Sequence, residues 1–262
     1  PARYKFVVTL EPGSGQSASA FQNDWDVWVY PSNVDVQPPV GVVVARDLDD
    51  EALAALKAGS KVLLLIPPNR VKGDRLGKVA LGFSSIFWNT AWTRRQPPTT
   101  LGILCDPKHP ALAEFPTDYH SNWQWWYLVS RARGMILDEL PKELRPTVQV
   151  IDDWVTNRKL GLVFEAKAGA GKLLVCSIDL KNSPDPNPVA RQMLHSLLNY
   201  MAGRHFNPKV AVSRENIARL LDSTQASKLV TLGAKVIEAD SEDTANGNVA
   251  ADAIDGDPET FW

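Results

Sequence analysis

The sequence predicts an α/β fold built on a parallel sheet that is covered on both faces. Two short segments, Val40–Ala45 and Lys61–Ile66, are apolar apart from Lys61, which is typical of strands that are buried on both sides. Between them, Leu48–Ala58 has the pattern of a helix, with Asp47 as its expected N-cap and Gly59 as its stop. A strand, a helix and a second strand in this order indicate a parallel crossover unit.

The N-terminal segment has a different pattern, that of two strands without a helix. Tyr4–Leu10 and Asp24–Tyr30 are rich in β-forming residues, and a loop rich in glycine and serine joins them. Two strands alone do not make a stable sheet. We therefore expect residues 1–32 either to be the last strands of a β-sandwich whose other strands lie outside this chain, or to pair with the next domain.

The elements that follow continue the α/β pattern to residue 204. Four more segments are expected to be strands: Leu101–Cys105, Gln149–Trp154, Gly161–Ala166 and Lys172–Ile178. Four segments are expected to be helices: His109–Phe115, Ser121–Ala132, Pro188–Ala202 and Arg214–Leu221. Asn187 and Gly203 are the expected cap and stop of the third helix. The third and fourth strands flank a short turn and are expected to form a hairpin.

The composition argues against several classes of protein. The chain has 262 residues, 44% of them hydrophobic, which is enough to bury a core. Its net charge of −2 gives no electrostatic case for binding nucleic acid or an acidic membrane, and no segment approaches the ~20 apolar residues of a membrane span. We therefore expect neither partner. The chain starts at Pro1 and ends at Trp262 after a predicted turn, so we expect it to be a fragment of a longer protein.

The candidate binding site lies in Gly82–Trp126, which holds five of the nine tryptophans. Indole rings stack on the C–H face of a sugar, and neighbouring amide and imidazole groups bind its hydroxyls. An alternative interpretation is a core or a domain interface built from the same residues. The candidate substrate-binding residues are Trp88, Asn89, Trp92, His120, Asn122, Trp123 and Gln124.

No motif in the sequence forms a complete catalytic, cofactor or metal site. Cys105 follows a strand but lacks the small neighbours and the helix of a nucleophile elbow, so it and Cys176 are expected to be buried as small hydrophobic residues. Ala166–Lys172 resembles a phosphate-binding loop only in part, because it lies between two strands and lacks the serine or threonine after its lysine. We interpret it as a hairpin turn.

The histidines and acidic pairs are also expected to have structural roles. None of the four histidines has the spacing of a metal ligand, and His195 is expected to be a satisfied structural residue within a helix. Glycoside hydrolysis needs two carboxyl groups at a defined separation, whereas sequence neighbours point apart. The pairs expected to be solvated charges or caps are Asp49/Asp50, Asp138/Glu139 and Asp152/Asp153.

Several segments resemble one family of enzymes. NDWDVWVYP (Asn23–Pro31) resembles the closing strand of a β-sandwich in large bacterial enzymes of glycoside hydrolase family 2. Gly82–Trp126 resembles the accessory domain that follows in the β-galactosidase-like members, and Leu160–Gly203 continues the match. NGNVAADAIDGDPETFW (Asn246–Trp262) resembles the opening of a discoidin-type carbohydrate-binding module.

The resemblance implies a fold and a set of domain boundaries. The accessory domain is similar to the class I glutamine amidotransferases, a flavodoxin-like parallel sheet with helices on both faces, but lacks their cysteine nucleophile. The implied domains are the terminal sandwich strands at 1–32, the amidotransferase-like domain at 33–204, a linker with a short helix at 205–234, and the truncated start of a discoidin-type module at 235–262.

The resemblance also implies a function, that of a non-catalytic accessory segment. The parent enzyme would hydrolyse terminal β-glycosides, galactosides first, with two glutamates on a catalytic barrel that has no counterpart in this chain. The implied partners are that barrel of the same parent chain and, second, carbohydrate; the implied location is periplasmic or extracellular. Two alternatives remain, a carbohydrate-binding module that uses the tryptophan-rich cluster and a small amidotransferase-fold enzyme that uses Cys105.

Overall fold

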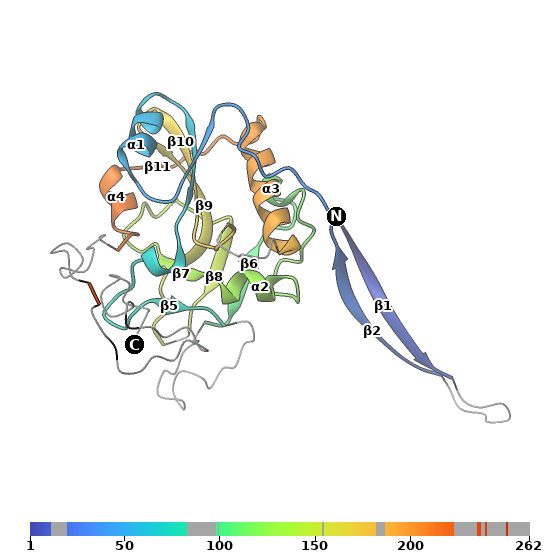
Figure 1. Ribbon diagram of the computed structural model, residues 1–262. Helices are drawn as coiled ribbons and strands as arrows, with labels where there is room; N and C mark the ends of the chain where they lie inside the picture. Colours follow the sequence, from blue (N-terminus) through green and yellow to red (C-terminus); the bar gives the residue numbers. More distant parts are fainter. Residues whose placement is uncertain are drawn as a thin grey trace.

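The protein is mixed α/β, with a large mixed sheet, few helices and a separate two-stranded hairpin (Figure 1). The computed structural model describes residues 1–11, 20–82, 98, 100–153, 155–181, 187–222, 235, 236, 239 and 250. The predicted discoidin-type tail therefore lies outside the described residues, apart from four isolated positions.

The predicted crossover unit is present at one side of the sheet. Strands β3 (Val42–Ala45), β4 (Lys61–Leu65) and β10 (Gly171–Cys176) lie side by side and are parallel. Helix α1 (Asp50–Lys57) connects the first two. Its N-cap is Asp49 and not the predicted Asp47, because the Asp49 carboxylate accepts the hydrogen bond of the Ala52 amide at 2.9 Å.

The rest of the sheet is mostly antiparallel, so the expectation of a parallel sheet holds only in part. Strand β9 (Leu160–Ala168) pairs antiparallel with β10, as the predicted hairpin requires, and also with β7 (Arg133–Ile136) and β8 (Val148–Ile151). Buried strands are apolar whichever way they run, so the sequence pattern does not reveal their direction. The remaining strands are β5 (Val79–Ala80) beside β7, β6 (Gly102–Cys105) beside β8, and β11 (Ala211–Val212), which is parallel to β9.

Most of the described helical segments begin at a side-chain cap or a proline; α2 (Trp125–Ser130) has neither. Helix α3 (Pro188–Ala202) has the predicted Asn187 cap, whose side chain accepts from the Val189 amide. The other helical segments are α2 (Trp125–Ser130), α4 (Arg214–Ala218), and two 3₁₀ turns, η1 (Pro68–Arg70) and η2 (Pro110–Leu112).

Two core clusters form on the two opposite sides of β4. Leu63 and Leu65 belong to a cluster that also contains residues of α2 and α3, whereas Val62 and Leu64 belong to one that contains residues of α1 and α4. Alternate side chains of a strand point to opposite sides of a sheet. The β-sheet therefore has apolar packing on both sides, which holds its strand ends in fixed positions.

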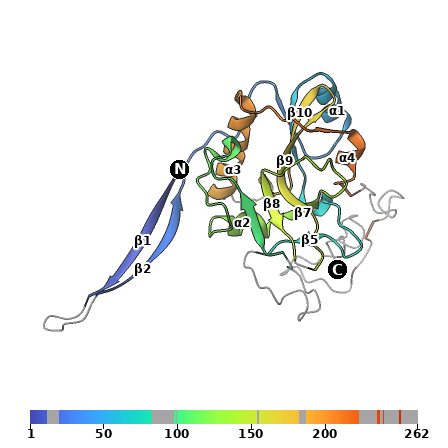
Figure 2. The ribbon, with the colours of Figure 1, turned by 180° about the vertical axis from the view of Figure 1, so that it is seen from behind.

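The N-terminal hairpin projects from this body. Strands β1 (Ala2–Leu10) and β2 (Phe21–Val29) pair antiparallel with each other and with no other described strand. Both ribbon views show the hairpin extending away from the body, with α2 and α3 on the side nearest to its base (Figures 1 and 2).

Candidate functional site

Four of the seven predicted site residues lie in one loop, residues 116–124, which precedes α2. Trp88, Asn89 and Trp92 lie outside the described residues. The loop runs beside the edge strand β6, where the Cys105 amide donates to the Tyr119 carbonyl at 3.0 Å. This pairing fixes the loop at the end of the sheet that is nearest to the hairpin base.

A close packing contact holds the middle of the loop. The Ser121 hydroxyl accepts a hydrogen bond from the Ile103 amide at 3.0 Å. A Cβ atom at the neighbouring Gly102 would lie 2.8 Å from that hydroxyl, and Gly102 has a φ of +136°. Glycine is therefore the residue that allows the loop to approach β6 so closely.

Gln124 connects the loop to the hairpin instead of pointing into solvent. Its Oε1 atom accepts from the Tyr30 hydroxyl at 2.5 Å, and its Nε2 atom donates to the Pro116 carbonyl at 2.7 Å. The Tyr30 ring stacks on Phe115 at 6.4 Å, and burial raises the pKa of Tyr30, so its hydroxyl remains a donor at neutral pH. Gln124 is buried and both of its polar atoms are used, so its role is structural.

Asn122 takes part in a second connection to the hairpin. Its Nδ2 atom donates to Asp118 at 3.1 Å, and the other oxygen of Asp118 accepts from Arg3 at 2.6 Å. Arg3 also pairs with Asp26 on the neighbouring strand at 2.5 Å and lies over the Trp28 ring at 5.7 Å. We call the residues of these two connections, Arg3, Tyr30, Asp118, Asn122 and Gln124, the junction.

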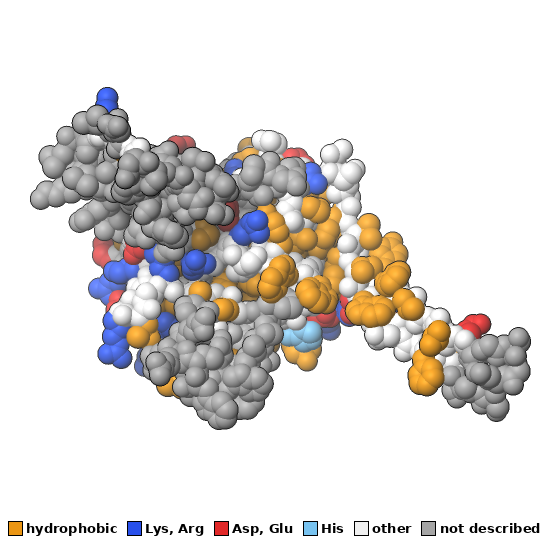
Figure 3. Space-filling model, turned by 60° about the horizontal axis from the view of Figure 1, so that its bottom comes forward, with side chains coloured by type: hydrophobic (Ala, Val, Ile, Leu, Met, Phe, Trp, Pro, Cys, Tyr) orange, Lys and Arg blue, Asp and Glu red, His pale blue; other side chains and the backbone are white. Residues whose placement is uncertain are grey.

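The aromatic side chains of the same region face solvent. Tyr119 is 60% exposed, Trp123 68% and Trp126 54%, and we call these three residues the aromatic surface. The His120 ring lies edge-on to Tyr119 at 4.7 Å and donates from Nδ1 to the Ser121 carbonyl. Figure 3 shows hydrophobic side chains gathered near the base of the hairpin and along it.

The predicted helix around these residues needs a correction. The sequence pattern placed Trp123 and Trp126 on one helical face within Ser121–Ala132, but α2 begins at Trp125 and buries Trp125, Leu128 and Val129. The two exposed tryptophans therefore lie on the opposite side from the core. Arg3, Tyr30 and Asp118 were missed by the sequence analysis, because no local spacing marks residues that meet across a long sequence separation.

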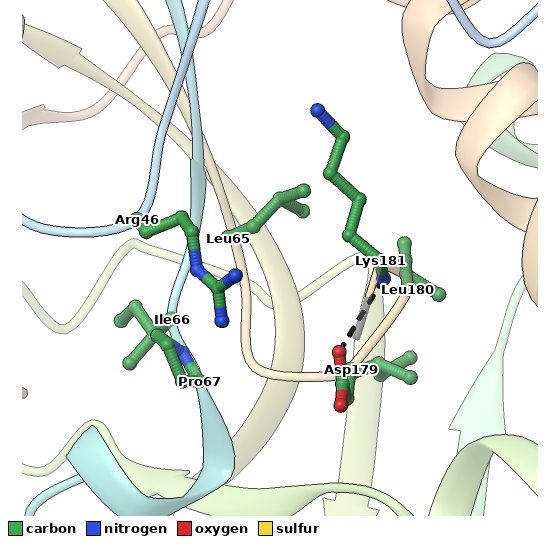
Figure 4. Close-up of a pocket in the computed structure, with 8 residues that line it drawn as sticks. Arg46, Leu65, Ile66, Pro67, Asp179, Leu180 and Lys181 are labelled. Carbon is green, nitrogen blue, oxygen red and sulfur yellow. Dashed lines mark hydrogen bonds between the residues drawn. The ribbon is translucent and has the colours of Figure 1, made fainter. Parts of the chain in front are cut away.

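A second place to look for a ligand is the carboxyl end of the three parallel strands, where open α/β sheets often bind ligands. Arg46 follows β3, Pro67 follows β4, and Asp179 and Lys181 follow β10 (Figure 4). The Lys181 amide donates to Asp179 at 3.3 Å, while the Lys181 side chain extends away from it. The cavity is about 10 Å³, room for roughly one water molecule, so it does not fit a sugar or a metabolite.

A larger and more open cleft of about 450 Å³ lies beside β7 and α4. Its lining includes three carboxylates, but each has a partner: Asp74 pairs with Arg158 at 3.1 Å, Glu139 pairs with Arg219 at 2.5 Å, and Asp138 accepts from the Lys159 amide. Glycoside hydrolysis uses two carboxyl groups at a defined separation across the sugar, whereas these three carboxylates are engaged with other side chains or with a backbone amide.

The two cysteines do not have the properties of a nucleophile. Cys105 and Cys176 are both free thiols and both buried, as predicted. Burial, with a smaller contribution from Asp106 and Asp118, raises the pKa of Cys105 to about 11. Burial likewise raises the pKa of Cys176 to about 12. Nucleophilic cysteines have lowered pKa values, so these observations count against the amidotransferase-type enzyme.

The other charged candidates are mostly structural. His195 is a satisfied residue, as predicted, with Nδ1 at 2.6 Å from the Asp35 carbonyl and Nε2 at 3.0 Å from Asn199. Asp153 caps a turn by accepting from the amides of residues 155 and 156. The prediction of a solvated charge was wrong for Asp152, because it is buried in an ion pair with Arg158.

The part of the chain that the structure describes contains no group of three or more His, Cys, Asp or Glu residues positioned to hold a metal ion. None of the helices in these residues combines the length and the apolar character that a bilayer crossing requires.

Comparison with known proteins gives one family. No curated protein matches the chain. A family model described as a domain of unknown function (DUF8487) matches residues 43–222, which run from β3 through α4 and leave out the hairpin. Because this match covers more than half of the sequence, the chain belongs to the DUF8487 family.

Proposed function

We propose that this chain is a non-catalytic accessory segment of a glycoside hydrolase of family 2, of the β-galactosidase type. The parent enzyme hydrolyses terminal β-glycosides in the periplasm or outside the cell. The accessory segment packs against the catalytic barrel of the same polypeptide, with the aromatic surface as its contact.

The exposure of Tyr119, Trp123 and Trp126 carries this proposal. Three large aromatic rings lie close together in the sequence, at positions 119, 123 and 126, and all are more than half exposed. Aromatic residues are enriched in the buried centre of protein interfaces. The junction holds the loop that carries Tyr119 and Trp123, and Trp126 belongs to α2, so the three rings stand on ordered segments.

The chemistry of the chain supports an accessory role. Its cysteines are buried with raised pKa values, and the carboxylates of the charged cleft are engaged in ion pairs or hydrogen bonds. The resemblance of Gly82–Trp126 to the accessory domain of β-galactosidase-like enzymes supports the choice of parent.

We also propose that the sheet derives from the flavodoxin-like fold of the class I glutamine amidotransferases, with helices on both faces. The parallel order of β3, β4 and β10 with α1 between the first two supports this relationship. The separate core clusters around α1 with α4 and around α2 with α3 support it further. In this view the antiparallel strands are a departure from that fold.

The test uses the parent enzyme with Trp123→Ala or Trp126→Ala. In the 262-residue chain alone, these variants should change the melting temperature much less than in the parent, because both side chains are more than half exposed. In the parent, each should lower the melting temperature or kcat/KM. Leu76→Ala, which removes an exposed side chain (49%) from a different segment, is the control and should change neither. Unchanged stability and kinetics in all parent variants would exclude the proposal.

Catalysis by the chain itself is tested separately. A panel of aryl β-glycosides should show no turnover with the 262-residue chain, because its cleft carboxylates are paired. Clear turnover would mean that two of these carboxylates form a working acid and nucleophile, and the accessory role would be wrong.

The exposed rings favour one alternative, a carbohydrate-binding module in which the aromatic surface holds sugar directly. Exposed tryptophan and tyrosine rings stack on pyranose faces, and His120 lies beside Tyr119. Titration of galactose and β-linked oligosaccharides against tryptophan fluorescence separates the two functions. Saturable binding that Trp123→Ala abolishes would favour the binding module over the docking segment.

A further inference from the structure

Two helical segments of the chain begin in the same way, with a capping side chain that is followed by a proline. At the start of α3, the Oδ1 atom of Asn187 accepts the hydrogen bond of the Val189 amide at 2.9 Å. At the start of η2, the Nδ1 atom of His109 accepts that of the Ala111 amide at 3.2 Å. Histidine is not among the residues preferred at this position. Of the two side chains, only the imidazole changes its charge near neutral pH.

The cap of η2 requires a neutral imidazole. A backbone amide can only donate, so Nδ1 of His109 accepts with its lone pair, and the proton of the neutral ring lies on Nε2. An imidazolium carries a hydrogen on both nitrogens and cannot accept. Protonation therefore breaks this hydrogen bond. It leaves the amide of Ala111, a fully buried residue, without its acceptor, which is unfavourable.

The surroundings of His109 define the pH range in which this happens. Its ring lies edge-on to Tyr200 of α3 at 5.5 Å. The charged groups that act on it are Asp106, just before η2, and Glu165 on β9, which also accepts the Tyr200 hydroxyl. Burial outweighs these carboxylates and lowers the pKa of His109. The stabilisation by the neutral ring is therefore complete above the unfolded pKa of about 6.5 and is lost as the pH falls through the folded value.

The segment that His109 caps leads directly into the loop that precedes α2. The Pro116 carbonyl accepts from Gln124, and the Thr117 hydroxyl accepts from Trp125 Nε1 at 2.8 Å. The start of the loop is therefore bonded to its end and to the first residue of α2. A change in the geometry of η2 moves the residues that make these two bonds.

The rest of η2 is held by groups that do not titrate between pH 5 and pH 7. The Ser196 hydroxyl of α3 donates to the Ala111 carbonyl at 2.7 Å and accepts from the Glu114 amide at 3.2 Å. Protonation of His109 therefore loosens this segment without detaching it from α3. The expected change is local and leaves the domain folded.

We propose that His109 makes the loop 116–124 sensitive to acid: its neutral imidazole closes the η2 turn at neutral pH, and its protonation opens that turn and weakens the attachment of the loop to β6. Because the loop carries Tyr119 and Trp123, acidification alters the aromatic surface. This pH response belongs to the chain itself, so it does not depend on which partner the aromatic surface contacts.

The experiment measures amide hydrogen exchange by NMR in the 262-residue chain at pH 7 and pH 5. The protection factor, which is the intrinsic exchange rate divided by the measured rate, removes the direct effect of pH on exchange. The protection factor of the Ala111 amide should fall about fivefold or more at pH 5. Those of the Ile103 and Cys105 amides, which donate to the loop, should also fall. The Val189 amide is the internal control and should not change, because Asn187 does not titrate.

Two variants assign the response to the imidazole. His109→Asn should keep the cap, because asparagine makes the equivalent hydrogen bond in α3, and its Ala111 protection factor should be the same at both pH values. His109→Ala lacks the acceptor, so it should show at pH 7 the low Ala111 protection that the unmodified chain shows at pH 5.

Three results would contradict the proposal. The first is an Ala111 protection factor that is equal at pH 7 and pH 5 in the unmodified chain. The second is a fall that persists in His109→Asn, because another group, such as His120 in the loop, would then be responsible. The third is a fall at Ala111 without one at Ile103 and Cys105, which would show that the loop does not follow the turn.

Discussion

Asp152 and Arg158 form a buried ion pair whose loss should be costly. The side chains are 2% and 12% exposed, and Arg158 donates to both carboxylate oxygens, from Nε at 2.9 Å and from Nη2 at 3.0 Å. Asp152→Asn removes the negative charge that faces the buried guanidinium. We therefore expect urea unfolding to show a loss of about 2 kcal/mol in the free energy of unfolding. Glu139→Gln makes the same chemical change in a pair that is more than half exposed, and it should cost less than about 1 kcal/mol.

The same pair gives a pH dependence. Burial disfavours the charged form of Asp152, but the hydrogen bonds and charge of Arg158 outweigh it and lower the pKa of that carboxyl. A lowered folded pKa means that the stabilisation is complete above the unfolded pKa and is lost as pH falls through the folded value. The difference in unfolding free energy between the wild type and Asp152→Asn should be constant from pH 7 to pH 5 and shrink below about pH 4. A difference that grows on acidification would contradict the assignment.

The raised pKa values of the thiols predict low reactivity. At pH 8 the thiolate fractions of Cys105 and Cys176 should be small, because their pKa values are about 11 and about 12. Iodoacetamide should therefore modify the folded chain much more slowly than the chain in guanidinium chloride, where both thiols should react. Rapid alkylation of Cys105 in the folded chain, with a change in any measured activity, would restore the amidotransferase-type alternative.

At the scale of elements, the sequence predicts best what local chemistry decides. The Asn187 cap and the adjacent proline mark α3, and the run of apolar residues at 62–66 marks β4. The sequence does not reveal β7, because four residues are too few to show a period. It also does not reveal that β6, β7 and β8 run antiparallel to their neighbours, since this depends on contacts with distant strands.

The turn between β9 and β10 provides a prediction at this scale. A Cβ atom at Gly171 would lie 2.6 Å from the Ser60 carbonyl and 2.8 Å from that of Leu56, both backbone atoms. Gly171→Ala should therefore destabilise the chain by about 3 kcal/mol, since the C-terminal end of α1 must move. Gly169 has a φ of +60° but more room, 3.6 Å to the nearest atom, so Gly169→Ala should cost only about 1 kcal/mol. Urea unfolding of both variants checks which one loses more unfolding free energy. Equal losses would show that backbone strain, and not crowding, dominates.

At the scale of the whole molecule, the sequence predicted the exposed aromatic part of the candidate site but not the contacts that attach it to the hairpin. Aromatic and amide residues clustered at 120–126 indicate a surface for contact, and Trp123 is indeed exposed. The same cluster did not reveal that Gln124 binds Tyr30. It also did not reveal that Asn122 binds Asp118, which in turn binds Arg3 of the hairpin. Such partners meet only after the sheet has brought distant segments together.

The junction should fix the direction of the hairpin more than it stabilises the fold. The Arg3–Asp118 pair is partly exposed and should contribute less than about 1 kcal/mol, and the Tyr30–Gln124 hydrogen bond about 1 kcal/mol. The double variant Arg3→Ala/Gln124→Ala removes both interactions and should therefore retain most of the unfolding free energy. The hairpin, which has no other strand partner among the described residues, should then sample many directions.

Spin labels at Thr9 on the hairpin and Lys108 on the body report this direction. Both positions are exposed, and the native thiols are buried, so cysteines introduced there can be labelled selectively. Electron–electron distance measurements should give a narrow distribution in the otherwise unmodified chain and a broad one in Arg3→Ala/Gln124→Ala. Lys5→Ala removes an ion pair that lies wholly within the hairpin, so its distribution should remain narrow. If all three distributions had the same width, the hairpin would owe its direction to contacts other than the junction.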